Sequence, residues 1–151
     1  MAGTRPGGAS GCGRRDACGD TGAVARLADV VFDCAHPAAL ARFWAAALDG
    51  YAIAPYDDHE LDRLAALGIH DVEDDPTVLV EGGAGQPRLW FQRVPEPKVV
   101  KNRVHLDVRA DDVAAEVARL VALGATRVDD GPIGDLVVLR DPEGNELCVV
   151  S

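Results

Sequence analysis

The sequence predicts an α+β fold in which two βαβββ modules share one open, curved, mixed sheet with the helices on its convex side. The main observation is that strand-type and helix-type hydrophobic periodicities follow one another in the order β-α-β-β-β from residue 27 onward, and that this order occurs twice. The opening strands are also alike, with Val30-Val31-Phe32-Asp33 in the first half and Val104-His105-Leu106-Asp107 in the second. The length agrees, because 151 residues that are 48% hydrophobic can form one core. A ferredoxin-like or doubly wound sheet would need fewer strands per helix or a helix between every pair of strands.

The first module is predicted to span residues 27–94. Pro37 opens its helix and Gly50 ends it, which matches the preference for proline at the first helical position and glycine after the last. The last two strands form a hairpin around the turn Gly82-Gly83-Ala84-Gly85. The predicted elements are a strand at 30–34, a helix at 37–48 and strands at 51–55, 77–81 and 88–94.

The second module is predicted to span residues 103–151, after a linker at 95–102 that Pro95-Glu96-Pro97 begins. Asp111 or Asp112 caps its helix, and Gly124 ends the helix. The predicted elements are a strand at 104–109, a helix at 113–123, strands at 125–129, 136–140 and 146–150, and a turn, Asp141-Pro142-Glu143-Gly144-Asn145, between the last two strands.

Residues 1–26 are predicted to be a disordered tail, because seven of the sixteen glycines fall within the first 22 residues and large apolar side chains are almost absent there. The net charge of −10 disfavours nucleic acid and anionic membranes as partners. The sequence has neither an apolar run long enough to span a membrane nor an apolar secretory signal, which predicts a cytoplasmic protein. Its four cysteines lack the spacing of a zinc site, and we expect them to be free thiols.

The acidic residues concentrate in residues 57–75, where Leu61, Leu64 and Leu67 indicate a short helix that Gly68 ends. A calcium loop would need alternating aspartates and a loop glycine, and this segment lacks that pattern. We therefore interpret residues 57–75 as a solvated acidic excursion between two strands.

Strand alternation predicts a polar face on the sheet. Val104, Leu106 and Val108 should pack under a helix, which leaves the residues between them on the opposite face. The side chains predicted to share that face are His105, Asp107, Arg109, Glu146, Cys148, Trp90, Gln92, and Asp29 or Asp33. Together they would make a polar pocket with an aromatic wall.

Two kinds of chemistry fit this face, and a third explanation is purely structural. A histidine and carboxylates from separate strands could bind a divalent metal ion with open coordination positions. A carboxylate whose pKa is raised in an apolar pocket could instead act as a general base without a metal. Alternatively, His105 and Asp107 only pair with each other or with the backbone.

Three stretches carry a family resemblance: Asp33-Cys34-Ala35-His36-Pro37 with Phe43-Trp44, the run from Leu89 to Val108, and the run from Asp141 to Cys148. From about residue 28 to residue 151 the chain resembles the vicinal oxygen chelate superfamily, which includes glyoxalases, bleomycin resistance proteins and extradiol dioxygenases. More closely, it resembles the glyoxalase-like proteins of the actinobacterial type within that superfamily.

The resemblance implies paired βαβββ modules around a pocket, commonly in dimers, so the predicted partners are a small-molecule ligand or substrate and a second copy of the chain. In the metal-dependent members the ligands come from the first, fourth, fifth and eighth strands. These positions fall on Asp29, near Gln92, on His105 and on Cys148, with Glu146 on the same face as Cys148. Matching the two internal repeats would put the first position on Val31 instead of Asp29. The implied divalent metal site, His105, Glu146 and Asp29, is an incomplete ligand set, and the cofactor stays open.

The residues and the resemblance together predict a glyoxalase-like domain that binds a small molecule in a concave pocket. If it is an enzyme, lyase, isomerase or dioxygenase-type chemistry is implied, with His105 as ligand or proton-transfer group and Glu146 or Asp107 as its carboxylate partner. The ligand pocket is predicted to contain Trp90, Gln92, Asp33, Arg109 and Cys148. The alternative is a non-catalytic binding protein similar to bleomycin resistance proteins, in which carboxylates beside Trp90 would suit a cationic aromatic ligand. Lys98, Lys101 and Arg103 would favour an anion instead if they edge the pocket.

Overall fold

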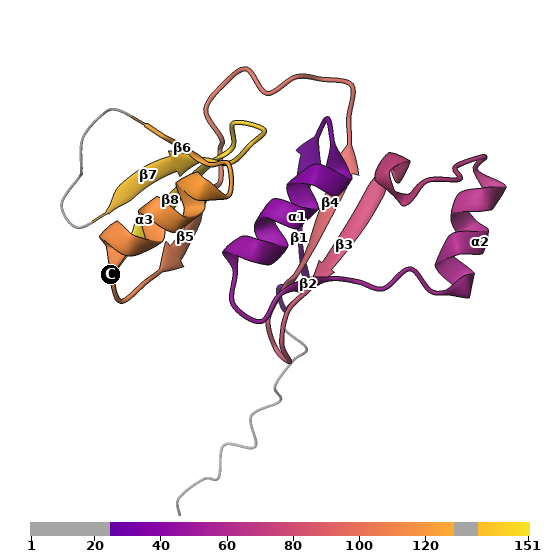
Figure 1. The fold of residues 1–151 in the computed structure, drawn as a ribbon, viewed down its shortest axis with the longest axis horizontal. Coiled ribbons are helices and arrows are strands. Elements are labelled where there is room, and N and C mark those ends of the chain that lie inside the picture. The colour runs from indigo at the N-terminus through magenta and orange to yellow at the C-terminus, as the bar shows by residue number, and fades with distance from the viewer. Residues whose placement is uncertain (1–24, 129–135) are drawn as a thin grey trace, which may run out of the picture.

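The computed structural model describes residues 25–128 and 136–151, and both halves follow the β-α-β-β-β order (Figure 1). The first module contains β1 (Asp29–Cys34), α1 (Pro37–Ala47), β2 (Ala52–Ile53), α2 (Asp58–Ala66), the short helix η1 (Val72–Asp74), β3 (Thr77–Glu81) and β4 (Arg88–Arg93). The second contains β5 (Leu106–Arg109), α3 (Val113–Ala122), β6 (Thr126–Arg127), β7 (Val137–Arg140) and β8 (Glu146–Val150). The predicted α+β class with two βαβββ modules is confirmed. The predicted tail up to residue 24 and the end of the predicted strand 125–129 lie outside the described residues.

Each module forms its own four-stranded mixed sheet, with strand orders β1-β4-β3-β2 and β5-β8-β7-β6. The first and last strands of each module pair in parallel, and the other neighbours pair antiparallel. Among the described residues no strand pairing joins the two sheets, so the strands form two hydrogen-bonded units where the sequence predicted one shared sheet. The edge strands β1 and β5 both contribute residues to one cavity instead.

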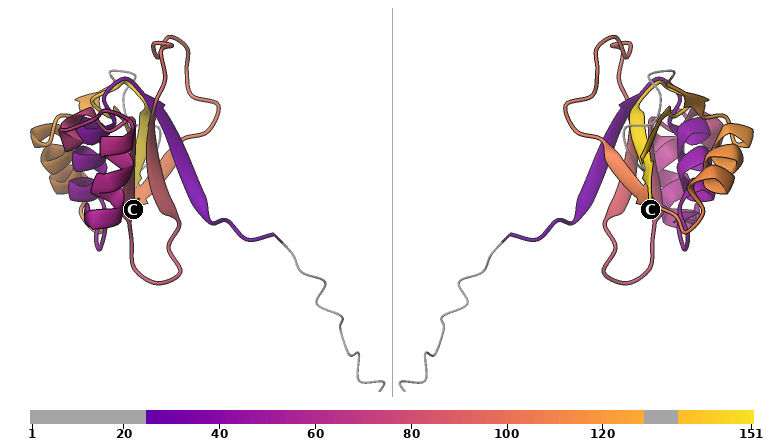
Figure 2. Two further views of the ribbon diagram at one scale, coloured as in Figure 1. Left: turned by 90° about the vertical axis from the view of Figure 1, so that its right-hand side faces the viewer. Right: turned by 90° about the vertical axis from the view of Figure 1, so that its left-hand side faces the viewer.

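The helices α1 and α3 lie on the same side of the strands, as the two views of Figure 2 show. Their apolar faces and the facing strand residues form one core that runs through both modules. In the first module, the Phe32 ring lies 5.1 Å from both Trp44 and Phe91. In the second, Leu147 and Val149 of β8 are fully buried. Within the described ranges, no helix combines the length and the apolar character that crossing a membrane requires.

Most predicted boundaries agree with the structure, and the glycine stops are correct because Gly50 and Gly124 have φ angles of 73° and 116°. The start of β5 differs. The predicted strand began at Val104, but β5 begins at Leu106, and the side chain of Val104 is 77% exposed. The expectation that Val104 packs under a helix was therefore wrong, because this residue still belongs to the chain that enters from the linker and strand alternation does not apply to it.

The two modules are joined by polar contacts to both ends of α1. At its C-terminal end, Arg119 of α3 donates from Nη1 to the carbonyl oxygen of Ala46 and from Nη2 to that of Ala47, each at 2.8 Å. These are carbonyls that a helix end leaves without intrahelical partners. The Glu116 carboxylate holds the same guanidinium in place.

The acidic segment at 57–75 contains α2 and η1, and its carboxylates serve local structure. Asp57 caps α2 by accepting from the backbone N–H of Glu60, and Asp71 caps η1. Asp75 is only 1% exposed and accepts hydrogen bonds from the Tyr56 hydroxyl and from Arg63. The acidic side chains of the segment were expected to be solvated, and Asp75 differs because these hydrogen bonds hold it in the interior.

Candidate functional site

A cavity of about 640 Å³ lies between β1, the linker and the β7–β8 turn. Its volume is within the range of small-molecule sites, roughly 300–1,000 Å³. Both modules contribute to its wall, so neither encloses it alone. The residues that line it are Val30 to Ala35, Trp44, Val94, Glu96, Pro97, Lys98, Asn102 to Leu106, Glu143, Asn145 and Glu146.

The linker that joins β4 to β5 arches over one end of the molecule (Figure 1) and is anchored by Glu146 of β8. The backbone N–H of Asn102 donates to Glu146 Oε2 at 3.0 Å, and Lys98 Nζ lies 3.2 Å from the same oxygen. Lys98 Nζ also donates to the carbonyl oxygen of Val100. The Glu146 side chain is only 9% exposed, so it is held between the strand and the linker.

These contacts determine the proton affinity of Glu146. Burial alone would raise the pKa of this carboxyl, but the N–H of Asn102 and the ammonium of Lys98 lower it to about 2. A carboxylate with so low a pKa is a weak base, because Asn102 and Lys98 both stabilise its charged form. The geometry therefore suits Glu146 as an anchor of the linker.

The β7–β8 turn closes the other side of the cavity through Glu143. Its carboxylate accepts hydrogen bonds from the backbone N–H groups of Ala35 and His36, at 3.1 and 2.8 Å. The His36 Nδ1 atom lies 3.0 Å from the same carboxylate. Burial would raise the pKa of Glu143, but these partners hold it below its usual range. Glu143 thus connects the β7–β8 turn to the β1–α1 loop of the other module. The sequence indicated only a turn here and gave no sign of this contact.

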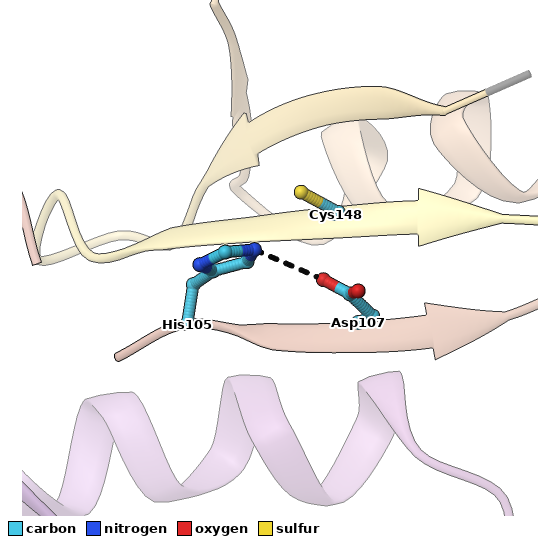
Figure 3. Close-up of side chains that lie close together, drawn as sticks. All are labelled: His105, Asp107 and Cys148. Carbon is cyan, nitrogen blue, oxygen red and sulfur yellow. Dashed lines mark ion pairs between the residues drawn. The ribbon is translucent and has the colours of Figure 1, made fainter. Parts of the chain in front are cut away.

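His105, which directly precedes β5, lies close to Asp107 of β5 and to Cys148 of β8 (Figure 3). The Nε2 atom of His105 lies 3.2 Å from Oδ1 of Asp107, and their side chains are 44% and 55% exposed. Cys148 pairs with Asp107 across the strands and is buried. Burial, and then the charge and hydrogen bond of Asp107, raise the pKa of the Cys148 thiol. Of these three residues, His105 alone lines the cavity.

Several predicted site residues lie outside the cavity. Both carboxylate oxygens of Asp29 accept from Arg88, at 2.7 and 3.0 Å. Trp90 lines a separate pocket of about 190 Å³ beside α2 and β3. The side chains of Gln92 and Arg109 are exposed, and Arg109 donates to the carbonyl oxygen of Ser151. Asp33, His105 and Glu146 are the predicted residues that line the cavity.

The metal-ligand positions that the resemblance implies do not come together in this structure. The carboxylate of Asp29 is hydrogen-bonded to Arg88, and neither Asp29 nor Gln92 lines the cavity. His105 and Cys148 do lie close together, with Asp107 as the third group. The four-strand ligand set therefore does not fit the residues present.

Sequence reasoning missed several residues of the cavity wall, among them Trp44, Asn102 and Glu143. Trp44 was assigned to the helix core, and it is 1% exposed, yet it also lines the cavity. The sequence did contain an indication for Glu143. It is a charged residue in a loop, and loops often carry functional residues. Asn102 acts through its backbone N–H, which no side-chain pattern reveals.

The fold of the chain is that of glyoxalase-related proteins. It is similar to a glyoxalase/bleomycin resistance protein/dioxygenase family enzyme from Burkholderia phytofirmans, with a TM-score of 0.56 and 17% identity over 83% of this chain and 97% of that one. It is similar to a fosfomycin resistance protein from Mesorhizobium loti, with a TM-score of 0.58 and 13% identity over 85% and 92% of the chains. A trypanothione-dependent glyoxalase I from Leishmania major has a TM-score of 0.54 and 15% identity over 85% and 87%.

Residues 29–150 match the model of the glyoxalase-like domain, which covers both modules. The chain therefore belongs to the glyoxalase-like domain family. It matches none of the curated proteins.

Proposed function

We propose that this glyoxalase-like domain, residues 27–151, binds a small organic molecule in the cavity between its two modules. The observation that carries the proposal is the cavity itself, about 640 Å³ in volume and lined from both modules. The contacts of Glu146 with the linker also support the proposal. They hold Lys98 and Asn102 in place, so the cavity stays open before a ligand binds.

The cavity wall offers an apolar base and charges of both signs. Phe32 and Trp44 supply the aromatic surface, and Trp90, which sequence reasoning had placed there, does not reach it. Asp33 and Glu96 are acidic and have no ion-pair partner among the described residues, whereas Lys98 is neutralised by Glu146. Arg103 also lines the cavity, and it donates to the carbonyl oxygen of Lys101. A polar ligand with an apolar portion suits this wall better than a purely cationic one.

A second candidate function, supported by the His105–Asp107 pair, is proton-transfer catalysis of the lyase or isomerase type. A half-exposed imidazole with a carboxylate 3.2 Å from Nε2 has the arrangement of a general acid–base group and the residue that orients it. In this scheme His105 exchanges a proton with a ligand in the cavity and Asp107 positions the ring. Glu146 would hold the linker and take no part in the proton transfer.

The proposal includes a homodimer and a cytoplasmic location. Four exposed valines support the dimer, because exposed apolar surface is typical of interaction sites. Val31 and Val104 line the cavity and are 55% and 77% exposed, and Val99 and Val100 of the linker are 82% and 67% exposed. Sedimentation of wild type and of Val104→Asp tests the dimer, since a wild type that stays monomeric at high concentration would contradict it. The buried free cysteines Cys34 and Cys148 fit a reducing compartment.

Filling the cavity tests the binding proposal. Wild type, Val31→Trp and the control Val121→Trp are screened by ligand-observed NMR against one fragment library that contains cationic aromatic, anionic and neutral members. Val31 lines the cavity, and Val121, which is 44% exposed, lies on α3 outside it. We expect fragments that bind wild type and Val121→Trp and that Val31→Trp no longer binds. Equal binding to all three proteins would overturn the proposal.

A further inference from the structure

We propose that the free edge of β1 in the cavity binds an extended peptide segment of about four to six residues, which pairs with it as an additional strand and carries a basic residue opposite Asp33. This inference rests on the proposed function, because it names the class of ligand that the same cavity would take. The hydrogen bonds to such a ligand come from the main chain of β1, and the side chains beside the edge select its sequence.

β1 has a neighbouring strand on one side only. It pairs in parallel with β4 from Asp29 to Cys34, and among the described residues no strand pairs with its other edge. That free edge lies in the cavity, because the consecutive residues 30–35 line the cavity wall. A space beside the face of a strand would be lined by alternate residues, whereas a space beside its edge is lined by consecutive ones. At a rise of about 3.3 Å per residue, this stretch is long enough for a peptide of about four to six residues.

The strand register shows which backbone groups of β1 face the free edge. The carbonyl oxygen of Cys34 accepts from the N–H of Val94, which follows β4. In a parallel pair, alternate residues of a strand direct both their N–H and their C=O groups to the neighbouring strand, so the even-numbered residues of β1 face β4. The N–H and C=O groups of Val31 and Asp33 therefore point away from β4, toward the cavity that these two residues line.

A contact within the protein shows that a hydrogen-bonding group can reach this edge. The N–H of Ala35, the next such group along the edge, donates to the Glu143 carboxylate of the other module at 3.1 Å. Val31 and Asp33 are exposed, so a ligand can approach their backbone groups. Free N–H and C=O groups along an edge strand are a template for pairing with another chain.

The charges beside the edge favour a basic peptide over a second copy of the same strand. Asp33 and Glu96 line the cavity and have no ion-pair partner within the described ranges. A second copy of β1 would bring its own Asp33 to this acidic wall, whereas a lysine or arginine is attracted to it. Val31 and Asp33 lie two residues apart on one face of β1, so the matching peptide carries an apolar residue and a basic residue two positions apart.

Amide hydrogen exchange of the full, isotopically labelled chain tests the pairing. The probe is an acetylated and amidated hexapeptide of threonine with valine at its second position and lysine at its fourth. We expect the amides of Val31 and Asp33 to exchange more slowly when the peptide is bound, and those of Val30 and Phe32, which already face β4, to be unchanged. Slow exchange of Val31 and Asp33 in the free protein would mean that another segment or a second copy covers the edge, and it would overturn the inference.

The fragment screen of the cavity separates this inference from the proposed function. A protein that binds fragments in the cavity but does not bind the hexapeptide would refute the inference and leave the proposed function standing. A protein that binds neither would refute both.

Methylation of the peptide nitrogens tests the main-chain hydrogen bonds without any change to the protein. One version of the hexapeptide is N-methylated at its second and fourth residues, and the other at its third and fifth. Alternate residues of a strand face its neighbour, so one version should lose two hydrogen bonds and bind roughly thirtyfold more weakly, while the other binds as the parent peptide does. Equal affinities of the two versions would contradict pairing with β1.

Charge reversal tests the position of the basic residue. Asp33→Lys should bind the lysine peptide more weakly than wild type does, and it should bind more tightly a version with glutamate at the fourth position. Glu81→Lys makes the same change of charge at an exposed position of β3 outside the cavity, and it should leave both affinities unchanged. The same preference for lysine in Asp33→Lys as in wild type would overturn the assignment of Asp33.

Discussion

The indole Nε1 of Trp44 donates to Oδ2 of Asp141 across a distance of 3.2 Å, and this buried hydrogen bond connects the helix of one module to the β7–β8 turn of the other. Asp141 is 2% exposed and also accepts from the backbone N–H groups of Glu143 and Asn145. Burial raises its pKa, although these donors offset part of that effect. Asp141 thus stabilises the backbone of its own turn. Through Trp44 it also positions the cavity wall.

Removing this acceptor should destabilise the whole domain. In Asp141→Ala, buried donors lose their partner, and we expect the free energy of unfolding to fall by about 2–3 kcal/mol. Trp44→Phe removes the indole donor while keeping an aromatic ring. Urea denaturation of both single variants and the double variant gives their coupling energy, which should be about 1 kcal/mol if the bond forms as described. Additive effects of the two substitutions would show that the bond contributes nothing.

Acid should weaken the second contact of the same turn. The folded-state pKa of Glu143 is below its unfolded value of about 4.3, so the stability it supplies is present above that pH and is lost as the pH falls through the folded-state pKa. The difference in unfolding free energy between wild type and Glu143→Gln should therefore shrink as the pH is lowered from about 6 to about 3. A difference independent of pH in this range would mean that the carboxylate charge is not what Ala35 and His36 recognise.

The exposed linker should be cleaved faster by a protease when its anchor is removed. Glu146→Ala frees Lys98 and the N–H of Asn102, and trypsin, which cleaves after Lys98, Lys101 and Arg103, should then cut the linker faster than in wild type. Glu96→Ala, in the same linker but without an ion pair among the described residues, is the matched control and should leave the cleavage rate unchanged. Equal rates in both variants would contradict the anchoring role of Glu146.

Two arginines that differ in what they contact provide a further comparison. Arg119 bonds two carbonyls at the end of α1, and Arg119→Ala should lower the free energy of unfolding by about 1–2 kcal/mol. Arg42 forms a bidentate but half-exposed pair with Glu73, and Arg42→Ala should cost only about 0–0.5 kcal/mol. Chemical denaturation measures both, and a cost for Arg119→Ala no larger than that for Arg42→Ala would refute the helix-end contact.

Local patterns predicted the fold well because its elements depend on short-range signals. The helix start at Pro37 and the glycines after each helix are set by neighbouring residues, and the structure agrees with both. The division into two sheets was not predictable in the same way. It depends on the distance between β1 and β5, the edge strands of the two sheets. Hydrophobic periodicity within one strand contains no information about its distance from another strand.

The candidate site was predictable only in part. Alternation correctly grouped Asp107 with Cys148, because these residues are directly opposite each other on the paired strands β5 and β8, and His105, just before β5, lies close to both. The same reasoning placed Asp29 and Trp90 in one pocket with them. This failed because the carboxylate of Asp29 is hydrogen-bonded to Arg88, and Trp90 lines the separate pocket beside α2. Contacts between modules, such as that of Glu143 with His36, come from segments over a hundred residues apart and leave no local pattern.

Amide chemical-shift mapping tests the central claim, a small-molecule site between the modules, most directly. A fragment that binds wild type is titrated into labelled protein, and the backbone amides that shift are assigned. We predict that the largest shifts fall on residues of the cavity wall from both modules, with Ala35, Asn102, His105 and Glu143 among them. Shifts confined to the smaller pocket around Tyr56 and Trp90, or to residues of one module alone, would contradict the account.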